Sequence, residues 1–183
     1  MTNPMMLLLV AATVLADQLT KAAALSLLSL GDAVPVLPGF GLALGFNEGS
    51  SFGMLSGVMA GKPLLMAALT GALTLIFAVM AVRARHPLER AGFVLVVGGA
   101  LGNIIDRLRQ GAVTDFLDLY WRNWHWPTFN VADIAITLGA VCILTCHGLF
   151  PPPAIRVRPS ERTDEDEEGT TDRGADHRHP AGA

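Results

Sequence analysis

The sequence VADIAITLGAVCILTCHGLF, residues 131–150, decides the fold because it is almost entirely apolar and carries one acidic residue, Asp133, near its start. A helix needs about 20 consecutive, mostly apolar residues to cross the hydrocarbon core of a bilayer. Three more stretches approach this length, at residues 5–28, 63–82 and 91–105, and the last of them needs part of its flanks. The sequence therefore predicts an all-α membrane protein with four transmembrane helices.

The composition separates an apolar body from a polar tail. Hydrophobic residues make up 51% of the 183-residue chain and charged residues 16%, against about 25% charged residues in soluble domains. Half of the 16 acidic residues lie within residues 161–176. We therefore expect a membrane-embedded domain at residues 1–159 and a disordered polar tail at residues 160–183, because the tail has too few apolar side chains to bury a core.

The connections between the expected helices also carry information. Residues 31–61 are rich in Gly, Pro and Ser and contain two short apolar pieces, VPVL at 34–37 and GLAL at 41–44, that favour extended structure. We expect a small sheet or flap at the membrane interface there. Between the third and fourth helices, four aromatic side chains lie within residues 120–126, which is typical of the headgroup level.

Arginine in the short connections indicates the orientation, since cytoplasmic loops carry an excess of Lys and Arg. Arginines lie between the second and third helices and after the fourth helix, at Arg83, Arg85, Arg90, Arg156 and Arg158. The connection between the third and fourth helices also holds arginines, so the asymmetry is weak. Four spans place both termini on one side. We expect the termini in the cytoplasm, and Asp115 and Asp133 at the extracytoplasmic face.

Asp115 and Asp133 are the strongest candidates for chemistry, because a carboxylate beside a bilayer is costly and is by default a functional candidate. Both lie at the ends of expected spans and are joined by one connection. Two carboxylates in a dry pocket cannot both ionise cheaply, so they share a proton and can act as acid and base in peptide hydrolysis. The alternative is two helix-boundary aspartates that cap helices or pair with an arginine. The spacing alone does not separate these interpretations.

Other polar residues could support such a site. Asn103 and Arg107 are one helical turn apart, after small residues that let helices approach closely. They could bind a pocket group or a lipid phosphate, or they could only close the helix end. Asp17 and Lys21 are also one turn apart, which favours a simple ion pair over a catalytic role. Asn47 favours a turn, and its functional alternative is a hydrogen bond to a bound peptide.

Rival chemistries have less support in the sequence. A Ser–Lys protease would use Lys21 with Ser50 or Ser51, but no pattern holds these groups together. Asp118, one turn from Asp115 in a helix, is expected at the surface. The His and Cys residues show no metal-ligand spacing, so no metal is predicted. A small transporter and a noncatalytic scaffold of packed helices are the alternatives from other classes of protein.

The motifs, considered as a set, resemble those of the lipoprotein signal peptidases, the bacterial signal peptidase II family. The resemblance rests on five segments in the family's order, which are DQLTK at 17–21, FNEGSSF at 46–52, GGALGNIIDR at 98–107, VTDF at 113–116 and FNVAD at 129–133. The chain departs from the family's pattern at Ser50 and Ser51, where small residues such as Ala are usual. Its polar tail is also longer than the family's core requires.

The resemblance implies an aspartic endopeptidase of the bacterial cytoplasmic membrane. Such an enzyme removes the signal peptide from diacylglyceryl-modified prolipoproteins just before the lipidated cysteine. The family has an extracytoplasmic β-cradle with a flap, uses no metal or cofactor, and is blocked by globomycin. Apart from these substrates and membrane lipids no partner is expected, nucleic acid included, and the protein is expected to act as a monomer. The family's positions fall on Asp115 and Asp133 as the catalytic pair, supported by Asn47, Asn103, Arg107, Asn130, Asp17 and Lys21.

Overall fold

The computed structural model describes residues 1–49 and 62–149, and within them four helices are long and apolar enough to cross a membrane. They are α1 (Asn3–Leu27), α3 (Pro63–Arg83), α4 (Pro87–Gln110) and α5 (Val131–Leu149). The prediction of four spanning helices is confirmed. Ser50, Ser51 and the tail at residues 160–183 lie outside the described residues.

Helix α4 is longer than its apolar stretch, because local signals set both of its ends. Pro87 occupies the first helical position, where its missing N–H is not needed. Gly111 ends the helix in the left-handed conformation, at φ 83°, and its N–H donates to the carbonyl oxygen of Arg107. The helix therefore continues through Asn103 and Arg107 before the chain turns sharply into a strand.

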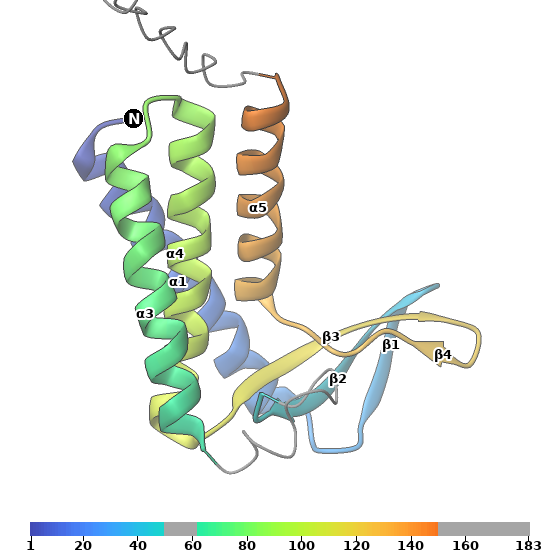
Figure 1. Ribbon diagram of the computed structural model, residues 1–183. Coiled ribbons are helices and arrows are strands. Elements are labelled where there is room, and N and C mark those ends of the chain that lie inside the picture. The colour runs from blue at the N-terminus through green and yellow to red at the C-terminus, as the bar shows by residue number, and fades with distance from the viewer. Residues whose placement is uncertain (50–61, 150–183) are drawn as a thin grey trace, which may run out of the picture. The chain divides into compact units, whose positions relative to one another are not determined.

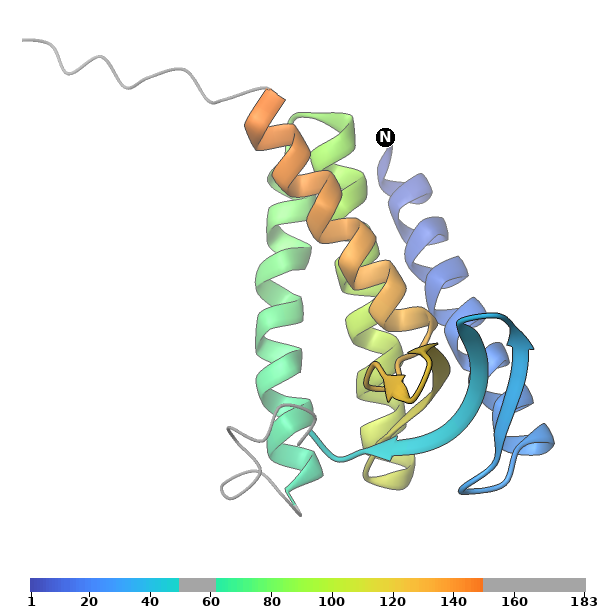
Figure 2. The same cartoon turned by 90° about the vertical axis from the view of Figure 1, so that its right-hand side faces the viewer.

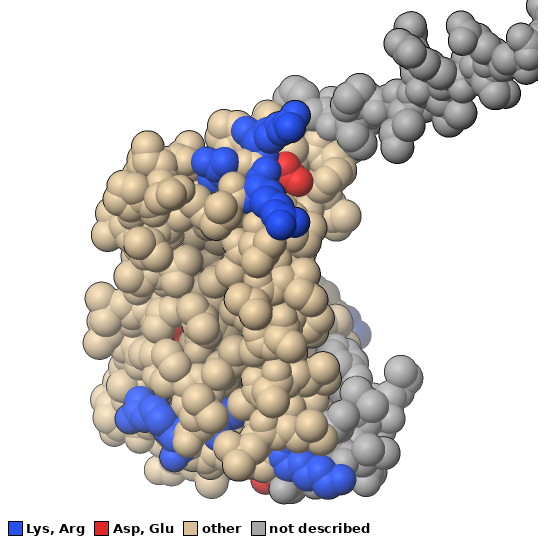
Figure 3. All heavy atoms as spheres, turned by 60° about the vertical axis from the view of Figure 1, so that its left-hand side comes forward, with Lys and Arg blue, Asp and Glu red and all other residues tan. Residues whose placement is uncertain are grey.

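Helix α4 is also the central helix and packs against α1, α3 and α5 (Figures 1 and 2). In its apolar span 56% of the residues are buried, whereas in the other three spans 17–22% are buried. The outer helices expose large apolar side chains such as Leu7, Leu64 and Leu144, an arrangement that suits lipid better than water. Basic side chains gather towards the two ends of one face, with an almost uncharged band between them (Figure 3). These features agree with a bundle that crosses a membrane.

Glycines let α4 and α5 approach backbone to backbone. A methyl group added at Gly139 would meet the carbonyl oxygen of Gly92 and, at 2.8 Å, Cγ2 of Val96. One added at Gly99 would meet the carbonyl oxygen of Ala132. The small residues thus act as helix-packing residues, as membrane helices commonly use them. They bring the polar end of α4 against the first turn of α5.

We expect Gly139→Ala to lower the stability of the protein by about 1–3 kcal/mol, because the added methyl group overpacks a contact between two backbones. Thermal denaturation in detergent measures the effect. Gly148→Ala is the matched control in the same helix, since no atom lies within 4 Å of its added methyl group. Equal melting temperatures for the two variants would contradict the close α4–α5 contact.

A four-stranded antiparallel sheet lies at one end of the helices (Figures 1 and 2). Its strands are β1 (Ala33–Leu37), β2 (Phe40–Asn47), β3 (Val113–Trp121) and β4 (Trp124–His125), in that order across the sheet. The first two confirm the extended pieces that the sequence predicts between the first two spans. The other two come from the connection between α4 and α5, so the sheet joins both connections. Asp115 therefore lies on a strand.

Candidate active site at the junction of helices and sheet

Asp115 on β3 and Asp133 at the start of α5 interact electrostatically where the sheet adjoins the helices. Asp115 lies early in β3 and is 3% exposed, and Asp133 lies in the first turn of α5. The side chain of Asn130 lies between them and is fully buried. Its Nδ2 donates to Oδ1 of Asp115 at 2.6 Å, while its backbone N–H donates to Oδ2 of Asp133 at 3.2 Å. One asparagine therefore holds both carboxylates.

Asn130 and Asp133 also form a capping box at the start of α5. The Asp133 N–H donates to Oδ1 of Asn130 at 3.0 Å, and the carboxylate of Asp133 accepts from the N–H of Asn130. This reciprocal pair satisfies two donors that a helix start otherwise leaves free. Asp133 is thus a capping aspartate, which is one of the alternatives that the sequence left open, and it also interacts electrostatically with Asp115.

Asn103 connects this pair to a second polar cluster. Its Nδ2 donates to Oδ1 of Asp133 at 3.0 Å. Its Oδ1 accepts from Nζ of Lys21 at 2.9 Å and from Nδ2 of Asn130 at 3.3 Å. Since both ends of the amide are engaged, the donor towards Asp133 cannot rotate away without breaking other bonds.

Lys21 is the centre of a buried ion triad. Its Nζ lies 2.8 Å from Oδ2 of Asp17 and 2.9 Å from Oδ2 of Asp106, and the three side chains are at most 6% exposed. The ion pair expected between Asp17 and Lys21 is therefore present, but it is buried and shared with a second carboxylate. A buried charge is tolerated only when it is paired and hydrogen-bonded.

The triad also joins four elements at the site. Oδ1 of Asp17 accepts from the N–H of Ala132 at 2.9 Å, which ties α1 to the start of α5. Oδ2 of Asp106 accepts from the N–H of Thr114 at 3.0 Å, which ties α4 to β3 one residue before Asp115. Each carboxylate of the triad thus holds the backbone next to one aspartate of the pair.

Asn47 and Arg107 complete the polar lining. Asn47 ends β2, and its Oδ1 accepts from the N–H of Gly49 at 2.8 Å, which confirms the expected turn. Its side chain also hydrogen-bonds Asp115. Arg107 donates to the carbonyl oxygen of Asn103 at 3.4 Å and interacts electrostatically with both aspartates. Its Nε is buried and has no partner within the described residues.

The environment of Asp115 favours its protonated form. Burial, followed by the negative charge of Asp133, raises its pKa from 3.8 to about 6. Hydrogen bonds from Asn130 and Asn47, and the charge of Lys21, act in the opposite direction and limit the rise. Asp115 can therefore take up or release a proton near pH 6 at low cost, which suits acid–base chemistry.

An apolar groove leads away from this pair along α5. It has a volume of about 580 Å³, and its polar lining residues are Asn47, Thr128, Asp133 and Thr137. Its walls come from α5 and from the segment that follows β4, and its lining residues are Asn47, Leu119, Trp126, Pro127, Thr128, Phe129, Asp133, Ile134, Thr137 and Leu138. Such a groove can hold an apolar chain with its end against a carboxylate. In the described ranges, no three His, Cys, Asp or Glu side chains lie together as a metal site requires.

All eight candidate residues of the sequence therefore lie in one connected polar cluster. The cluster also contains Gln18 and Thr114, which the sequence did not single out, and Asp106, for which it indicated only a supporting or structural role. Gln18 donates to Oδ1 of Asp106 at 2.9 Å, and Thr114 is fully buried. Asp106 could have been found from its helical spacing to Asn103. The expectation that Asp118 lies at the surface was wrong, because it is 4% exposed and lies on a strand.

Comparison with known proteins places the chain among bacterial membrane enzymes. The model of the family described as "Signal peptidase (SPase) II" matches residues 9–149. The "Lipoprotein signal peptidase" of Syntrophotalea carbinolica is 43% identical over 143 residues, covering 75% of this chain and 88% of that protein. The protein of the same name from Yersinia pseudotuberculosis is 38% identical over 135 residues, covering 73% and 80%.

Two solved structures share the fold. Both are described as "Bacterial membrane enzyme structure by the in meso method", and each is 26% identical to this chain. One has a TM-score of 0.69 and covers 79% of this chain and 87% of its own, and the other has a TM-score of 0.71 and covers 81% and 94%. The four helices and the small sheet are therefore shared with bacterial membrane enzymes.

Proposed function

Because this chain belongs to the signal peptidase II family, whose members remove signal peptides from lipoproteins, we propose that Asp115 and Asp133 are its catalytic pair. The chain is then an aspartic endopeptidase. The observation that carries the proposal is the single buried asparagine, Asn130, which hydrogen-bonds both carboxylates, of which Asp133 lines an apolar groove. Helix capping alone accounts for Asp133 but not for the burial of Asp115 beside it.

In the proposed reaction Asp133 is the base and Asp115 the acid. Asp133 accepts hydrogen bonds from Asn103 and from the N–H of Asn130, which hold its carboxylate as an acceptor at the start of α5. The raised pKa of Asp115 supports its holding the proton. Asp133 takes a proton from water as the water oxygen attacks the peptide carbonyl carbon, while Asp115 donates its proton to the carbonyl oxygen. Asp133 then gives its proton to the leaving nitrogen as the C–N bond breaks, and Asp115 takes its proton back from the hydroxyl of the tetrahedral intermediate as the carbonyl re-forms.

The remaining residues would bind the substrate or hold the pair. Asn47, which lines the groove, and Arg107, whose Nε has no partner among the described residues, would donate hydrogen bonds to the peptide backbone. Asn103 and Asn130 orient the carboxylates, while Asp17 and Lys21 hold the surrounding elements. No step of this mechanism requires a metal or a cofactor.

The substrate would be a diacylglyceryl-modified prolipoprotein, cut just before the lipidated cysteine. Its acyl chains keep the scissile bond near the membrane surface, and the groove presents apolar walls beside Asp133. We place the site at the extracytoplasmic face, with both termini in the cytoplasm and the enzyme acting as a monomer. The arginines near the turn between α3 and α4, at the end of the bundle away from the sheet, support this orientation.

Cleavage of a lipidated precursor by the purified protein in detergent tests the proposed function. The product should begin at the lipidated cysteine, and globomycin should block its release. A transporter or a noncatalytic scaffold would release no peptide. A product cut elsewhere, or an intact precursor after prolonged incubation, would contradict the proposal.

The pH dependence of kcat/KM should report Asp115. We expect kcat/KM to fall about tenfold per pH unit above pH about 6, because the free enzyme then loses the proton that Asp115 donates. Asn47→Leu removes a hydrogen bond that stabilises ionised Asp115, so the fall should begin at higher pH in that variant. If kcat/KM instead rises through pH 6 to a plateau, Asp115 is not the group that donates the proton.

The raised pKa of Asp115 also determines how its contribution to the stability of the fold changes with pH. Folded Asp115 holds its proton up to about pH 6, whereas an ordinary aspartate loses it near 3.8. The folded state therefore binds the proton more tightly than the unfolded state does. The contribution is present below pH 3.8 and is lost as the pH rises to about 6, which adds a downward slope to stability across that interval.

A further inference from the structure

Asp118 is a buried carboxylate that the proposed mechanism does not use. Its side chain is 6% exposed, and Nδ1 of His125 lies 3.0 and 2.8 Å from its two oxygens. A buried carboxylate is costly unless it is paired, so its partner strongly influences the structure around it. Asp118 lies three residues after Asp115 on β3, and side chains alternate along a strand. The pair of Asp118 and His125 therefore lies on the face of β3 opposite to Asp115.

His125 lies in a short hairpin and joins it to β3 through two side chains. Strand β4 consists of Trp124 and His125 alone, and the turn before it contains Arg122 at φ 56°, which is unfavourable for a residue other than glycine. His125 lies opposite Tyr120 in the register and stacks on its ring, with the centroids 5.4 Å apart. The contacts of His125 with Asp118 and Tyr120 thus compensate for a short strand and a strained turn.

The segment that follows His125 forms one wall of the groove. Trp126 and Phe129 both line it, and their N–H groups donate to carbonyl oxygens of β3, Leu119 at 2.8 Å and Leu117 at 3.1 Å. Because neighbouring side chains of an extended chain point to opposite sides, fixing His125 against Asp118 turns Trp126 towards the groove. Trp126 is 50% exposed, and it is held by its backbone hydrogen bond and by an edge contact with the ring of Trp124, with the centroids 5.9 Å apart.

We propose that Asp118 and His125 are positioning residues that hold the Trp126 wall of the groove and thereby set the affinity for the lipidated substrate. The inference rests on the proposed peptidase function, because the groove is taken as the substrate's site. The pair itself lies on the other face of the strand from Asp115. Its loss should therefore weaken substrate binding and leave the chemical step almost unchanged.

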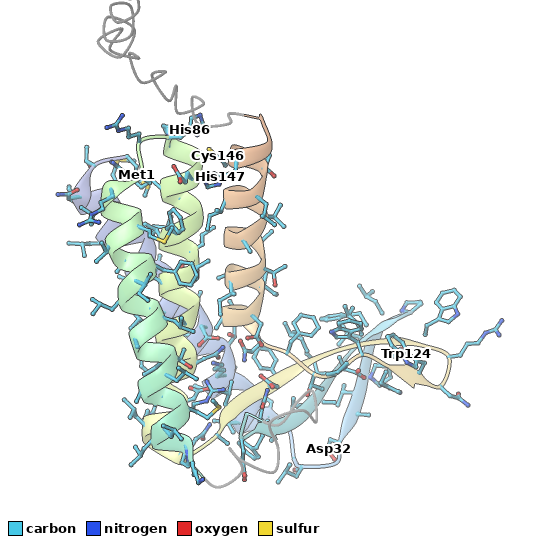
Figure 4. The ribbon with its side chains drawn as sticks, viewed as in Figure 1. Met1, Asp32, His86, Trp124, Cys146 and His147 are labelled. Carbon is cyan, nitrogen blue, oxygen red and sulfur yellow. The ribbon has the colours of Figure 1, made fainter. Side chains whose placement is uncertain are left out.

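Kinetics on a lipidated precursor peptide test this proposal with four variants, three at His125 and one at His147. His125→Ala should raise KM about tenfold, because it leaves Asp118 buried without its partner, and should change kcat by less than about twofold. His125→Asn puts an amide nitrogen in the place of Nδ1 and should restore KM, whereas His125→Gln carries that nitrogen one carbon further and should not. His147→Ala is the matched control, because His147 is 52% exposed, contacts Glu89 at 3.5 Å and lies at the opposite end of the helices from Trp124 (Figure 4). An unchanged KM in His125→Ala, or a loss confined to kcat, would overturn the proposal.

Two further measurements separate this inference from the proposed function. Amide hydrogen exchange at Trp126 and Phe129 should accelerate in His125→Ala and return towards the original rate in His125→Asn, whether or not the protein cleaves a precursor. In a Trp126→Ala background, His125→Ala should have little further effect on KM, because both changes remove the same wall. Unchanged exchange, or a full effect of His125→Ala in that background, would refute the positioning role. A protein that cleaves no precursor yet shows the exchange effect would instead refute the peptidase function.

Discussion

Asp133→Asn and Asp115→Asn should each abolish cleavage of a lipidated precursor. The cleavage rate should fall by at least the roughly 10²–10⁴-fold that one acid–base group contributes. Asparagine cannot take a proton from water in place of Asp133, and it cannot deliver one to the carbonyl oxygen in place of Asp115. The effect should lie in kcat, because neither change alters the apolar walls of the groove.

Both variants should remain folded, so the loss can be assigned to chemistry. Asparagine at position 133 keeps an oxygen that accepts from the N–H of Asn130, and asparagine at 115 keeps one for Nδ2 of the same residue. Asp133→Asn should lower stability more, by about 1 kcal/mol. Its amide nitrogen would replace one of the two oxygens that accept hydrogen bonds from Asn103 and Asn130.

Asp32→Asn is the matched control for these variants. Asp32 is an exposed carboxylate before β1, where it accepts from the N–H of Ser29 at 2.9 Å (Figure 4). Its replacement should leave the rate unchanged. Melting temperatures in detergent and cleavage rates should be measured on the same preparations. Appreciable activity in a folded Asp115→Asn or Asp133→Asn variant would exclude the catalytic pair.

Lys21→Met should have the largest effect on stability, lowering it by about 3–5 kcal/mol. The change leaves the carboxylates of Asp17 and Asp106 buried without the cation that both contact. It also removes the donor to Oδ1 of Asn103 and so frees the amide that orients Asp133. Cleavage should therefore fall together with the melting temperature.

Two comparisons make the Lys21 result specific. Lys62→Met removes an exposed lysine before α3 and should change the melting temperature little. Lys21→Met combined with Asp106→Asn should recover part of the loss, because only one carboxylate then remains unpaired. A melting temperature equal to that of Lys62→Met would show that the triad contributes little to stability.

The helices could be predicted because their signals are local. The apolar length of each span and the one-turn spacing of Asp17 and Lys21 are visible in a short window of sequence, and both are found in the structure. The third span was predicted too short, since its ends depend on Pro87 and Gly111 rather than on apolar residues. The two strands after the first span were likewise bounded by turn residues.

The second half of the sheet could not be predicted in the same way. The sequence around Asp115 and Asp118 favours the end of a span followed by a loop. The strand β3 was missed because its partner β2 lies far earlier in the sequence. Its neighbour β2 lies some 70 residues earlier, with Gly45 opposite Asp115 in the register. Asp118 was misplaced at the surface for the same reason, since its burial follows from the sheet.

The sequence by itself determined the number of spans and, through its motifs, the carboxylates and asparagines that form the candidate site. Only the tertiary structure decided how they are connected. Lys21 reaches Asn103 across 82 residues, and Asp17 holds the start of α5 across 115. These contacts arise because Gly98 and Gly102 let α1 lie close to α4, while Gly99 and Gly139 let α4 and α5 pack closely. The tertiary structure also buries Asp115, and that burial, which no local pattern encodes, raises its pKa to about 6.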